Sequence, residues 1–426
     1  MFDRKSFVYL PFNILFLLIT YYILHLLTQE IFAWIYVKDI SILRFIIGYS
    51  CMLFLAYFMM SKICNRKYSI SIYVIIYFTF IFPATGYYVI GGMLFQVYFS
   101  IICCFFGVLF LTKNTAKQIR VFKKGSLSST KVVIILFLCL VVALIHAVTT
   151  TAGNYIYAYS DIYKHRAVYS DALSSGIMGY FNGWVYKVIT PLLGCILLYM
   201  KKYKLFAFMF FLDFVAFLFN GQKSILANVI LELFLYIYLV YDINDLRRVA
   251  RLVQYFMLFL IAFLYFTHSA SISFLTVRVF ETPYKVYNDC FKYIFTGNAY
   301  YMWQNGIIGE LLGVAKTTNA SLAHIIGEYN GTGDSANSGY ISSAFASAGW
   351  LGVIITSGLM AVIMNIINFS MKDPAKRFIV VGTSISSILQ AYISSDLFTT
   401  MLTHGLLLAI LLCFIIKDVD FERHGT

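Results

Sequence analysis

The feature that most constrains this chain is a series of long apolar runs separated by short basic segments. Hydrophobic residues make up 61% of the 426 residues, and the mean hydropathy is +0.81. A helix needs about 20 mostly apolar residues to cross a bilayer, whereas a barrel strand needs only about 10. Backbone inside lipid must also satisfy its own hydrogen bonds, which helices do within one segment. The sequence therefore predicts an all-α polytopic membrane protein.

We expect about twelve membrane-spanning helices, counted as apolar runs long enough to cross a bilayer. Their approximate limits are 7–29, 40–61, 68–84, 93–112, 132–151, 183–200, 205–220, 225–241, 252–270, 341–369, 378–395 and 400–416. Together they form a single transmembrane domain over residues 1–426. The first run resembles a signal peptide but is too long, and no small-residue cleavage site follows it, so we expect a retained helix.

The distribution of charge predicts the orientation of the chain. There are 32 Lys and Arg against 19 Asp and Glu, a formal net charge of +13. A basic chain can bind nucleic acid, but here most basic residues cluster in the segments between apolar runs, as at Arg247–Arg251. Such clusters mark cytoplasmic loops. We expect both termini in the cytoplasm, which agrees with an even number of spans, and we expect no nucleic-acid partner.

Cysteine usage points to neither disulfides nor a metal. Most of the eight cysteines lie in apolar runs, and only Cys290 falls in a long polar interval, where it has no partner. No CxxC or His/Cys spacing typical of a metal site is present. We therefore expect no metal and no other cofactor.

Two outer loops are longer than connectors need to be. Loop A covers residues 152–183 and loop B covers residues 271–340, and both are rich in Tyr, Gly and Asn. Within loop B, the segment from Pro283 to Phe295 favours a short helix at the membrane interface, with an aromatic face and a Lys285–Asp289 pair at i,i+4. Charged residues near the outer membrane face are costly unless they are satisfied, so these loops hold the candidate functional residues.

In loop A the candidates are His165 and Arg166. Arginine stays protonated and offers a planar fork that matches phosphate oxygens. The alternative is an arginine that pairs with a carboxylate or reaches lipid headgroups. The next candidate is Lys223, in the turn Asn220–Ser224 between two hydrophobic runs. A phosphate ligand or a headgroup would each explain a lysine there; the glycine spacing of a P-loop is missing.

In loop B, Arg278 and Glu281 are spaced i,i+3. They could form a structural salt bridge, or they could supply a cation for a leaving group beside a carboxylate base. The run Gly331–Tyr340 contains Asp334 and Asn337. Such a run can present backbone N–H groups to an anion or to sugar hydroxyls at a helix start, or it can be a turn with a polar cap.

His404 is the last candidate, together with the segment Ser394–Asp396. It falls inside the twelfth expected span, about one helical turn below the outer surface. A lone histidine in a membrane helix is most often a hydrogen-bonded structural residue.

The layout and several short segments resemble the bacterial O-antigen and capsule polymerases of the Wzy type. These segments are Gly-Gln-Lys-Ser at 221–224, Arg-Val-Phe-Glu-Thr-Pro at 278–283, Ala-Asn-Ser-Gly-Tyr at 336–340 and Ala-Gly-Trp-Leu-Gly at 348–352. The resemblance covers the whole chain in layout and only these segments in wording. It implies a GT-C-like glycosyltransferase in the bacterial inner membrane that joins oligosaccharide repeat units carried on undecaprenyl pyrophosphate, at the periplasmic face.

The resemblance also implies roles for the candidates. The essential arginines of such polymerases correspond to Arg166 and Arg278. With Lys223 they could neutralise the departing pyrophosphate without a metal, and Glu281 or Asp334 could accept the proton of the attacking sugar hydroxyl.

Further substrate contacts would come from His165, Asn337 and Tyr340. The partners implied by the resemblance are the lipid-linked oligosaccharide, membrane lipid and a separate protein that regulates chain length.

Two other readings remain open. An O-antigen ligase shares the layout and the donor and depends on a histidine in the large outer loop, where His324 is the only candidate. A flippase for the same lipid-linked units would not be an enzyme. It would be expected to show two similar halves and charges deep within the spans, whereas the sequence shows no repeat and its candidate charges gather near the outer surface.

Overall fold

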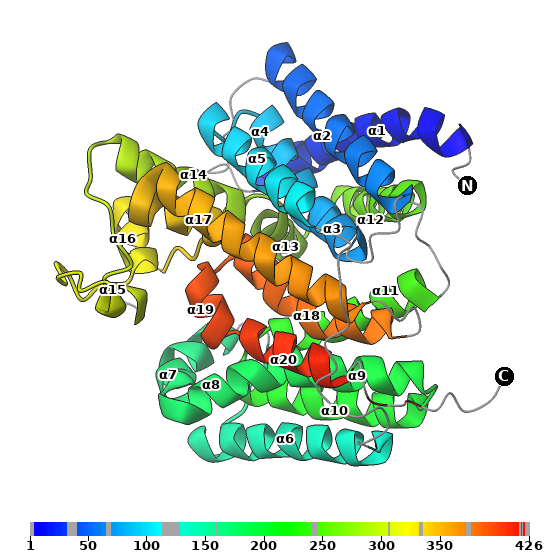
Figure 1. The fold of residues 1–426 in the computed structure, drawn as a ribbon, viewed down its shortest axis with the longest axis vertical. Coiled ribbons are helices and arrows are strands. Elements are labelled where there is room, and N and C mark those ends of the chain that lie inside the picture. Colours follow the sequence, from blue (N-terminus) through cyan, green and yellow to red (C-terminus); the bar gives the residue numbers. More distant parts are fainter. Residues whose placement is uncertain are drawn as a thin grey trace. The chain divides into compact units, whose positions relative to one another are not determined.

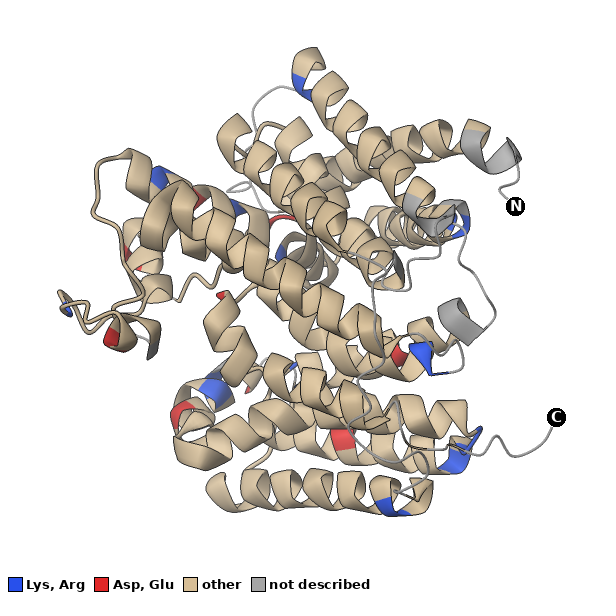
Figure 2. Cartoon of the chain, viewed as in Figure 1, with Lys and Arg blue, Asp and Glu red and all other residues tan. Residues whose placement is uncertain are grey.

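The structure, a computed structural model, describes residues 4–31, 41–64, 70–112, 128–158, 161–240, 246–305, 307–331, 335–371, 376–416, 419 and 421. Every extended regular element in these ranges is a helix, and no β-strand occurs among them. Figure 2 shows long helices on which Lys, Arg, Asp and Glu are sparse. The prediction of an all-α protein is therefore confirmed for the part of the chain that the structure describes.

Eight helices in the described ranges are long and apolar enough to cross a membrane. They are Val8–Ile31, Ile42–Ser61, Ser71–Val89, Ser129–Thr150, Gly176–Tyr199, Tyr203–Asn220, Arg248–Thr267 and Tyr340–Ser370. Each coincides with one expected span. The other four expected spans coincide with the shorter apolar helices Phe95–Leu111, Ser224–Ile237, Arg377–Ile393 and Leu406–Ile416. The membrane character is supported, and the number of twelve spans stays a prediction.

The chain divides into two compact units. Unit 1 comprises residues 1–114, 244–365 and 391–397. Its helices are α1 (Arg4–Ile31), α2 (Ile42–Cys64), α3 (Ile70–Ile76), η1 (Tyr77–Ile81), α4 (Phe82–Val89), α5 (Phe95–Leu111), α12 (Leu246–Thr267), α13 (Ala270–Phe280), α14 (Thr282–Phe295), α15 (Ile307–Leu311), α16 (Leu322–Tyr329) and most of α17 (Tyr340–Ser370) (Figure 1). Within it, α1 packs along α12 and also contacts α2 and α13.

Unit 2 comprises residues 115–243, 366–390 and 398–426. Its helices are α6 (Ser129–Thr150), α7 (Ile162–Ser174), α8 (Gly176–Trp184), η3 (Val185–Ile189), α9 (Thr190–Tyr199), α10 (Tyr203–Asn220), α11 (Ser224–Val240), most of α18 (Arg377–Ile393), α19 (Leu397–Leu402) and α20 (Leu406–Ile416). Helix α10 contacts α6, α9 and α11, so these four helices form the body of the unit.

Both long loops are largely helical. Loop A contains α7 and α8, and the helix expected to begin near residue 183 begins at Gly176. Loop B contains α13 to α16. The run expected at 400–416 is interrupted: α19 ends at Leu402 and α20 begins at Leu406, with Gly405 at a positive φ of 74°. A glycine adopts this backbone conformation at little cost, and it ends one helix before the next begins.

The short helix expected at Pro283–Phe295 is confirmed as α14 (Thr282–Phe295). Most of its aromatic face is covered, because Tyr284, Tyr287 and Phe291 are fully buried in unit 1, whereas Phe295 at its end is exposed. The Phe291 ring stacks on Phe345 of α17 at 3.9 Å between centroids. Tyr284, Tyr287 and Phe291 thus pack in the core of unit 1 and anchor loop B, although the amphipathic pattern predicted them at the membrane interface.

Two π-helical turns, η1 and η3, interrupt long helices, and a proline follows each of them. Pro83 and Pro191 lie at the first positions of α4 and α9. Proline has no N–H group, so it cannot donate to the carbonyl four residues earlier, and its ring crowds that carbonyl. A π-turn with i→i+5 bonds absorbs this defect. The bonds from Phe82 N to Tyr77 O and from Thr190 N to Val185 O have this spacing.

Candidate functional site

The candidates of loop A and of the Asn220–Ser224 turn meet at one end of unit 2. Gly221 ends α10 with φ 65°, and a Cβ atom placed on it would lie 2.9 Å from Arg166 Cγ. The aliphatic stem of Arg166 therefore rests on Gly221, while the residue as a whole is exposed. Lys223 follows two residues later and is partly buried. Two cationic side chains that are far apart in sequence are brought into one neighbourhood.

Hydrogen bonds hold loop A against this turn. The Ile156 N–H donates to Leu218 O at the end of α10, at 3.0 Å. His165 Nε2 lies 3.1 Å from Asn154 O, and the Asn154 amide donates to Tyr169 Oη at 2.8 Å. His165 thus helps to hold α7 in place and is not directed to a ligand through Nε2.

Asn220, which is buried, holds the turn in place through hydrogen bonds of its side chain. Its amide nitrogen donates to Ala216 O at 2.9 Å and to Tyr186 Oη at 3.4 Å. Tyr186 belongs to η3, so the turn that carries Lys223 is bonded to the π-helical turn of the same unit. These bonds stabilise the turn on which Arg166 rests, and we call Arg166 together with the turn Asn220–Ser224 the basic cap.

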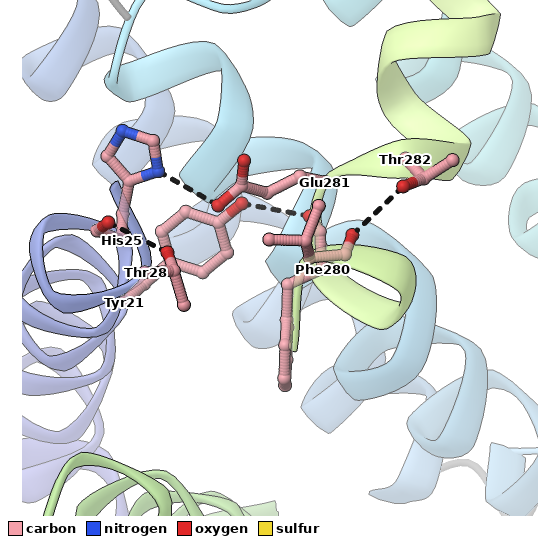
Figure 3. A network of polar contacts seen from close by, with 7 residues as sticks. Tyr21, His25, Thr28, Phe280, Glu281 and Thr282 are labelled. Carbon is pink, nitrogen blue, oxygen red and sulfur yellow. Dashed lines mark hydrogen bonds and ion pairs between the residues drawn. The ribbon is translucent and has the colours of Figure 1, made fainter. Parts of the chain in front are cut away.

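The candidates Arg278 and Glu281 separate in unit 1, although they are three residues apart. Arg278 is exposed near the end of α13, whereas Glu281 is buried at the corner between α13 and α14. Glu281 Oε1 lies 2.9 Å from His25 Nδ1 of α1 (Figure 3). Among the described residues no ion pair joins Arg278 to Glu281, so the salt bridge considered from the i,i+3 spacing is replaced by a histidine–carboxylate pair.

The His25–Glu281 pair is enclosed by further contacts of α1 with loop B. Tyr21 Oη donates to Phe280 O at 2.9 Å, one helical turn before His25 (Figure 3). The Thr282 hydroxyl donates to Val277 O at 3.2 Å across the α13–α14 corner. Glu281 Oε2 and His25 Nε2 are buried without a hydrogen-bond partner among the described residues. Sequence reasoning missed His25, since nothing local links it to a residue so distant in the chain.

The candidates before α17 differ in their exposure. Asn337 is exposed, whereas Tyr340 is 1% exposed and packs edge-on against Tyr392 with 5.1 Å between ring centroids. Tyr340 thus belongs to the core of unit 1 in this structure, and its ring is covered. Asp334 lies outside the described residues. The His324 of loop B is partly exposed on α16 and pairs with Glu328 at 3.2 Å, i,i+4.

Loop B also buries an acid outside the spans. Asp289 of α14 accepts a hydrogen bond from Asn330 at 2.9 Å, which ties α14 to the end of α16. Burial raises the pKa of the Asp289 carboxyl above its ordinary value, and Lys292, Lys285 and the Asn330 bond oppose that rise. The Lys285–Asp289 interaction expected from the i,i+4 spacing thus has an electrostatic counterpart.

Two carboxyl groups lie inside the helical body of unit 2. Asp213 of α10 is 0% exposed and Glu232 of α11 is 1% exposed. None of their four oxygens has a hydrogen-bond partner among the described residues. Glu232 Oε2 occupies the space beside Gly194 of α9, where a Cβ atom would lie 1.9 Å away. The expectation that charges gather near the outer surface is therefore incomplete, because apolar runs conceal single acids.

No protein-family model matches the chain, and no curated protein or solved structure matches it significantly. Within the described ranges, no group of three or more His, Cys, Asp or Glu side chains is placed to hold a metal ion. Any function must therefore be argued from the chain's own residues.

Proposed function

We propose that this protein is a membrane glycosyltransferase of the Wzy type. It would polymerise undecaprenyl-pyrophosphate-linked oligosaccharide repeat units into O-antigen or a related surface polysaccharide. This proposal includes twelve spans with both termini cytoplasmic, a GT-C-like arrangement and an active site that faces the periplasm of a bacterial inner membrane. The growing chain would pass from its lipid carrier to a new lipid-linked unit, and a separate protein would regulate its length.

The observation that carries the proposal is the basic cap. Arg166 rests on Gly221, two residues before Lys223 in the chain. The Ile156 N–H bond to Leu218 O ties loop A to the end of α10, and the Asn220 amide ties the turn to Tyr186. A pyrophosphate group carries several negative charges and binds best where several donors converge. Such a ligand can contact one cation from each of the two segments, whereas a headgroup contact would involve only one cation. The hydrogen bonds that hold the two segments in position involve neither the Arg166 nor the Lys223 side chain.

The reaction needs a cation for the leaving group and an acceptor for a proton. The acceptor sugar hydroxyl attacks the anomeric carbon, the bond to the carrier breaks, and undecaprenyl pyrophosphate leaves with negative charge. Arg166 and Lys223 are the groups best placed to stabilise that charge, and the exposed Arg278 could bind a second lipid-linked unit. Glu281 is paired with His25 and buried, so in this conformation it acts as a structural carboxylate rather than as the base. The candidate that accepts the proton of the sugar hydroxyl is then Asp334 of loop B.

Deleting the gene in its host tests this function directly. We expect the ladder of surface polysaccharide to collapse to carrier or core bearing one repeat, and the wild-type gene to restore it. Arg166→Gln should give the same collapse, whereas Lys204→Gln, an exposed lysine at the other end of α10, should not. A normal ladder from Arg166→Gln at normal protein levels would exclude that residue's role, and complete loss of the repeat would point to ligation or flipping instead.

A second candidate, an ion-coupled transporter of lipid-linked units, is favoured by one observation. Asp213 and Glu232 lie within helices α10 and α11, fully buried and unpartnered among the described residues. Ionisable groups inside membrane helices are costly and often mark ion or proton pathways. Proteoliposomes with a fluorescent lipid-linked repeat separate the two functions: a polymerase lengthens the oligosaccharide, whereas a transporter changes only the leaflet in which it lies.

A further inference from the structure

A second polar centre lies in unit 2, where the π-helical turn η3 meets the break between α19 and α20. Lys187 is in the middle of η3, and its Nζ lies 2.6 Å from Nδ1 of His404, which is in the break. Both side chains are partly buried. Sequence reasoning took His404 as an isolated histidine, and only the packing of α20 on η3 shows its lysine partner.

Side-chain hydrogen bonds and a close backbone contact hold the break between α19 and α20 in place. The Trp184 indole N–H donates to Leu402 O at 2.5 Å, which satisfies a carbonyl at the end of α19. The Ser387 hydroxyl of α18 donates to His404 O at 2.7 Å. A Cβ atom on Gly183 would lie 2.4 Å from Thr403 O, so only glycine lets the two segments approach this closely.

In the part of the chain that the structure describes, the Lys187–His404 contact leaves several hydrogen-bond donors of these two side chains without an acceptor. A charged lysine can only donate, so His404 must accept at Nδ1 and carry its proton on Nε2. The pair then offers the remaining Lys187 N–H groups and the His404 Nε2–H. Among the described residues no carboxylate forms an ion pair with Lys187, and a neutral imidazole does not balance its charge. A partly buried cation without a counter-charge is costly, and an anionic ligand would offset that cost.

The start of α20 adds to the same electrostatic bias. Gly405 precedes the helix and packs on η3, since a Cβ atom there would lie 2.9 Å from Val188 Cγ2. The first N–H groups of a helix have no intrahelical acceptor and favour negative charge. Half-helices that begin inside a membrane domain present such ends to anionic substrate groups. The lysine, the histidine and the start of α20 thus lie on contacting segments of unit 2.

This centre is bonded to the basic cap through one residue. Tyr186, adjacent to Lys187, accepts the Asn220 amide at its hydroxyl and the Asn228 amide at its carbonyl, at 3.4 and 2.8 Å. Asn220 belongs to the turn that carries Lys223. The inner centre and the basic cap therefore belong to one hydrogen-bonded part of unit 2.

We propose that Lys187 and His404 form an inner anion-binding subsite that takes a phosphate group of the lipid carrier's pyrophosphate. The inference rests on the proposed function, which supplies the ligand. It extends that function by assigning ligand binding to two residues of η3 and the helix break that lie outside both long loops.

The test is a binding measurement on the purified full-length protein in lipid nanodiscs. The two probes are inorganic pyrophosphate, followed by calorimetry, and undecaprenyl pyrophosphate incorporated in the nanodisc, followed by native mass spectrometry. The variants are Lys187→Gln, His404→Gln and the double variant, with Lys204→Gln as the matched control. Each single variant should bind about tenfold more weakly, since it removes a charge-assisted hydrogen bond, and the double variant should lose less than the product because the two residues act together.

The outcomes separate the inference from the proposed function. If wild type binds, Arg166→Gln weakens binding and both Lys187→Gln and His404→Gln bind like wild type, the inner subsite is wrong and the function survives. If wild type binds neither probe, both the subsite and the carrier are wrong. Retention of inorganic pyrophosphate with no lipid carrier would assign the site to a free phosphate compound and overturn the carrier assignment.

A second measurement covers the case in which the variants do not fold. An amine-reactive ester should label Lys187 of the wild-type protein more slowly when pyrophosphate is present, as judged by peptide mass spectrometry. Lys204 should be labelled at the same rate with and without the ligand. Equal labelling of Lys187 under both conditions would overturn the proposal.

Discussion

The two π-helical turns have the same origin but different surroundings. Thr79 in η1 and Lys187 in η3 each lie four residues before a proline, Pro83 and Pro191, which cannot donate to them. In unit 1, Tyr284 Oη donates to Thr79 O at 3.3 Å. In unit 2, the Asn228 amide donates to Tyr186 O at 2.8 Å. In both turns a side chain from a helix distant in sequence compensates for the irregular backbone.

The difference lies in what faces each turn. Around η1 the neighbours are aromatic, with the Phe80 ring between 5.4 and 5.8 Å from the rings of Tyr284, Tyr287 and Tyr392. Around η3 they are a lysine, a histidine and a helix break. A π-turn therefore does not mark a functional site by itself. It becomes a candidate where the distorted backbone positions polar groups that have unused donors.

The largest expected effect comes from substituting the residues at equivalent positions of the two turns, Lys187 in η3 and Thr79 in η1. Lys187→Met should lower repeat-unit polymerisation in proteoliposomes by about 100-fold, as loss of one charge-stabilising donor does in other enzymes. Its melting temperature should stay the same or rise, because a partly buried charge without a counter-ion is removed. Thr79→Val should leave polymerisation within about twofold, since its side chain is exposed.

Equal losses of polymerisation in Lys187→Met and Thr79→Val would contradict the distinction between the turns. Full activity of Lys187→Met would assign η3 a purely structural role.

A smaller effect is expected from glycines that let other segments approach the two turns. A Cβ atom on Gly183 would lie 2.4 Å from Thr403 O, and one on Gly86 would lie 2.6 Å from the Tyr21 ring. Each substitution by Ala forces a shift and should cost about 1–3 kcal/mol of stability, measured by thermal unfolding in detergent. Only Gly183→Ala should also reduce the activity per folded molecule, because it displaces the break that holds His404. An equal loss of activity per folded molecule in Gly86→Ala would contradict the distinction between the surroundings of η1 and η3.

The smallest effect concerns the side-chain donors to one carbonyl in each π-turn, Thr79 O and Tyr186 O. Tyr284→Phe and Asn228→Leu each remove such a donor, which costs up to about 1–3 kcal/mol where the carbonyl is buried. Asn228→Leu should be the costlier change, because Asn228 Oδ1 also accepts the Ser386 hydroxyl at 3.0 Å. Thermal unfolding of both variants beside wild type measures this ranking. A larger loss of stability in Tyr284→Phe than in Asn228→Leu would show that η1 depends on polar contacts more than its aromatic surroundings indicate.

Local sequence features predicted several parts of the structure correctly. The apolar runs marked the helices, and the pattern of α14 was recognised from its aromatic spacing. The roles of Arg166 and Lys223 stay predictions. The two successes share a cause, because hydropathy and helical periodicity depend on a few neighbouring residues.

The misses concern choices of partner. Glu281 could have paired with Arg278 three residues earlier, but it pairs with His25, 256 positions away. Tyr340 was grouped with the ligand contacts, yet it lies in the core against Tyr392. Asp213 and Glu232 were overlooked, since one acid does not alter the hydropathy of a long apolar run. For Glu281 and Tyr340, several partners were chemically suitable.

The amino-acid sequence by itself determined that this protein is built of apolar helices, because the cost of exposing backbone and charge to lipid acts on each segment separately. Pro83 and Pro191 follow the two π-helical turns, and the N–H that each lacks explains the irregular backbone there. Only the tertiary structure decided that Arg166 rests on Gly221 and that His404 meets Lys187. Such contacts depend on how distant helices pack, and packing selects one partner among many that local chemistry permits.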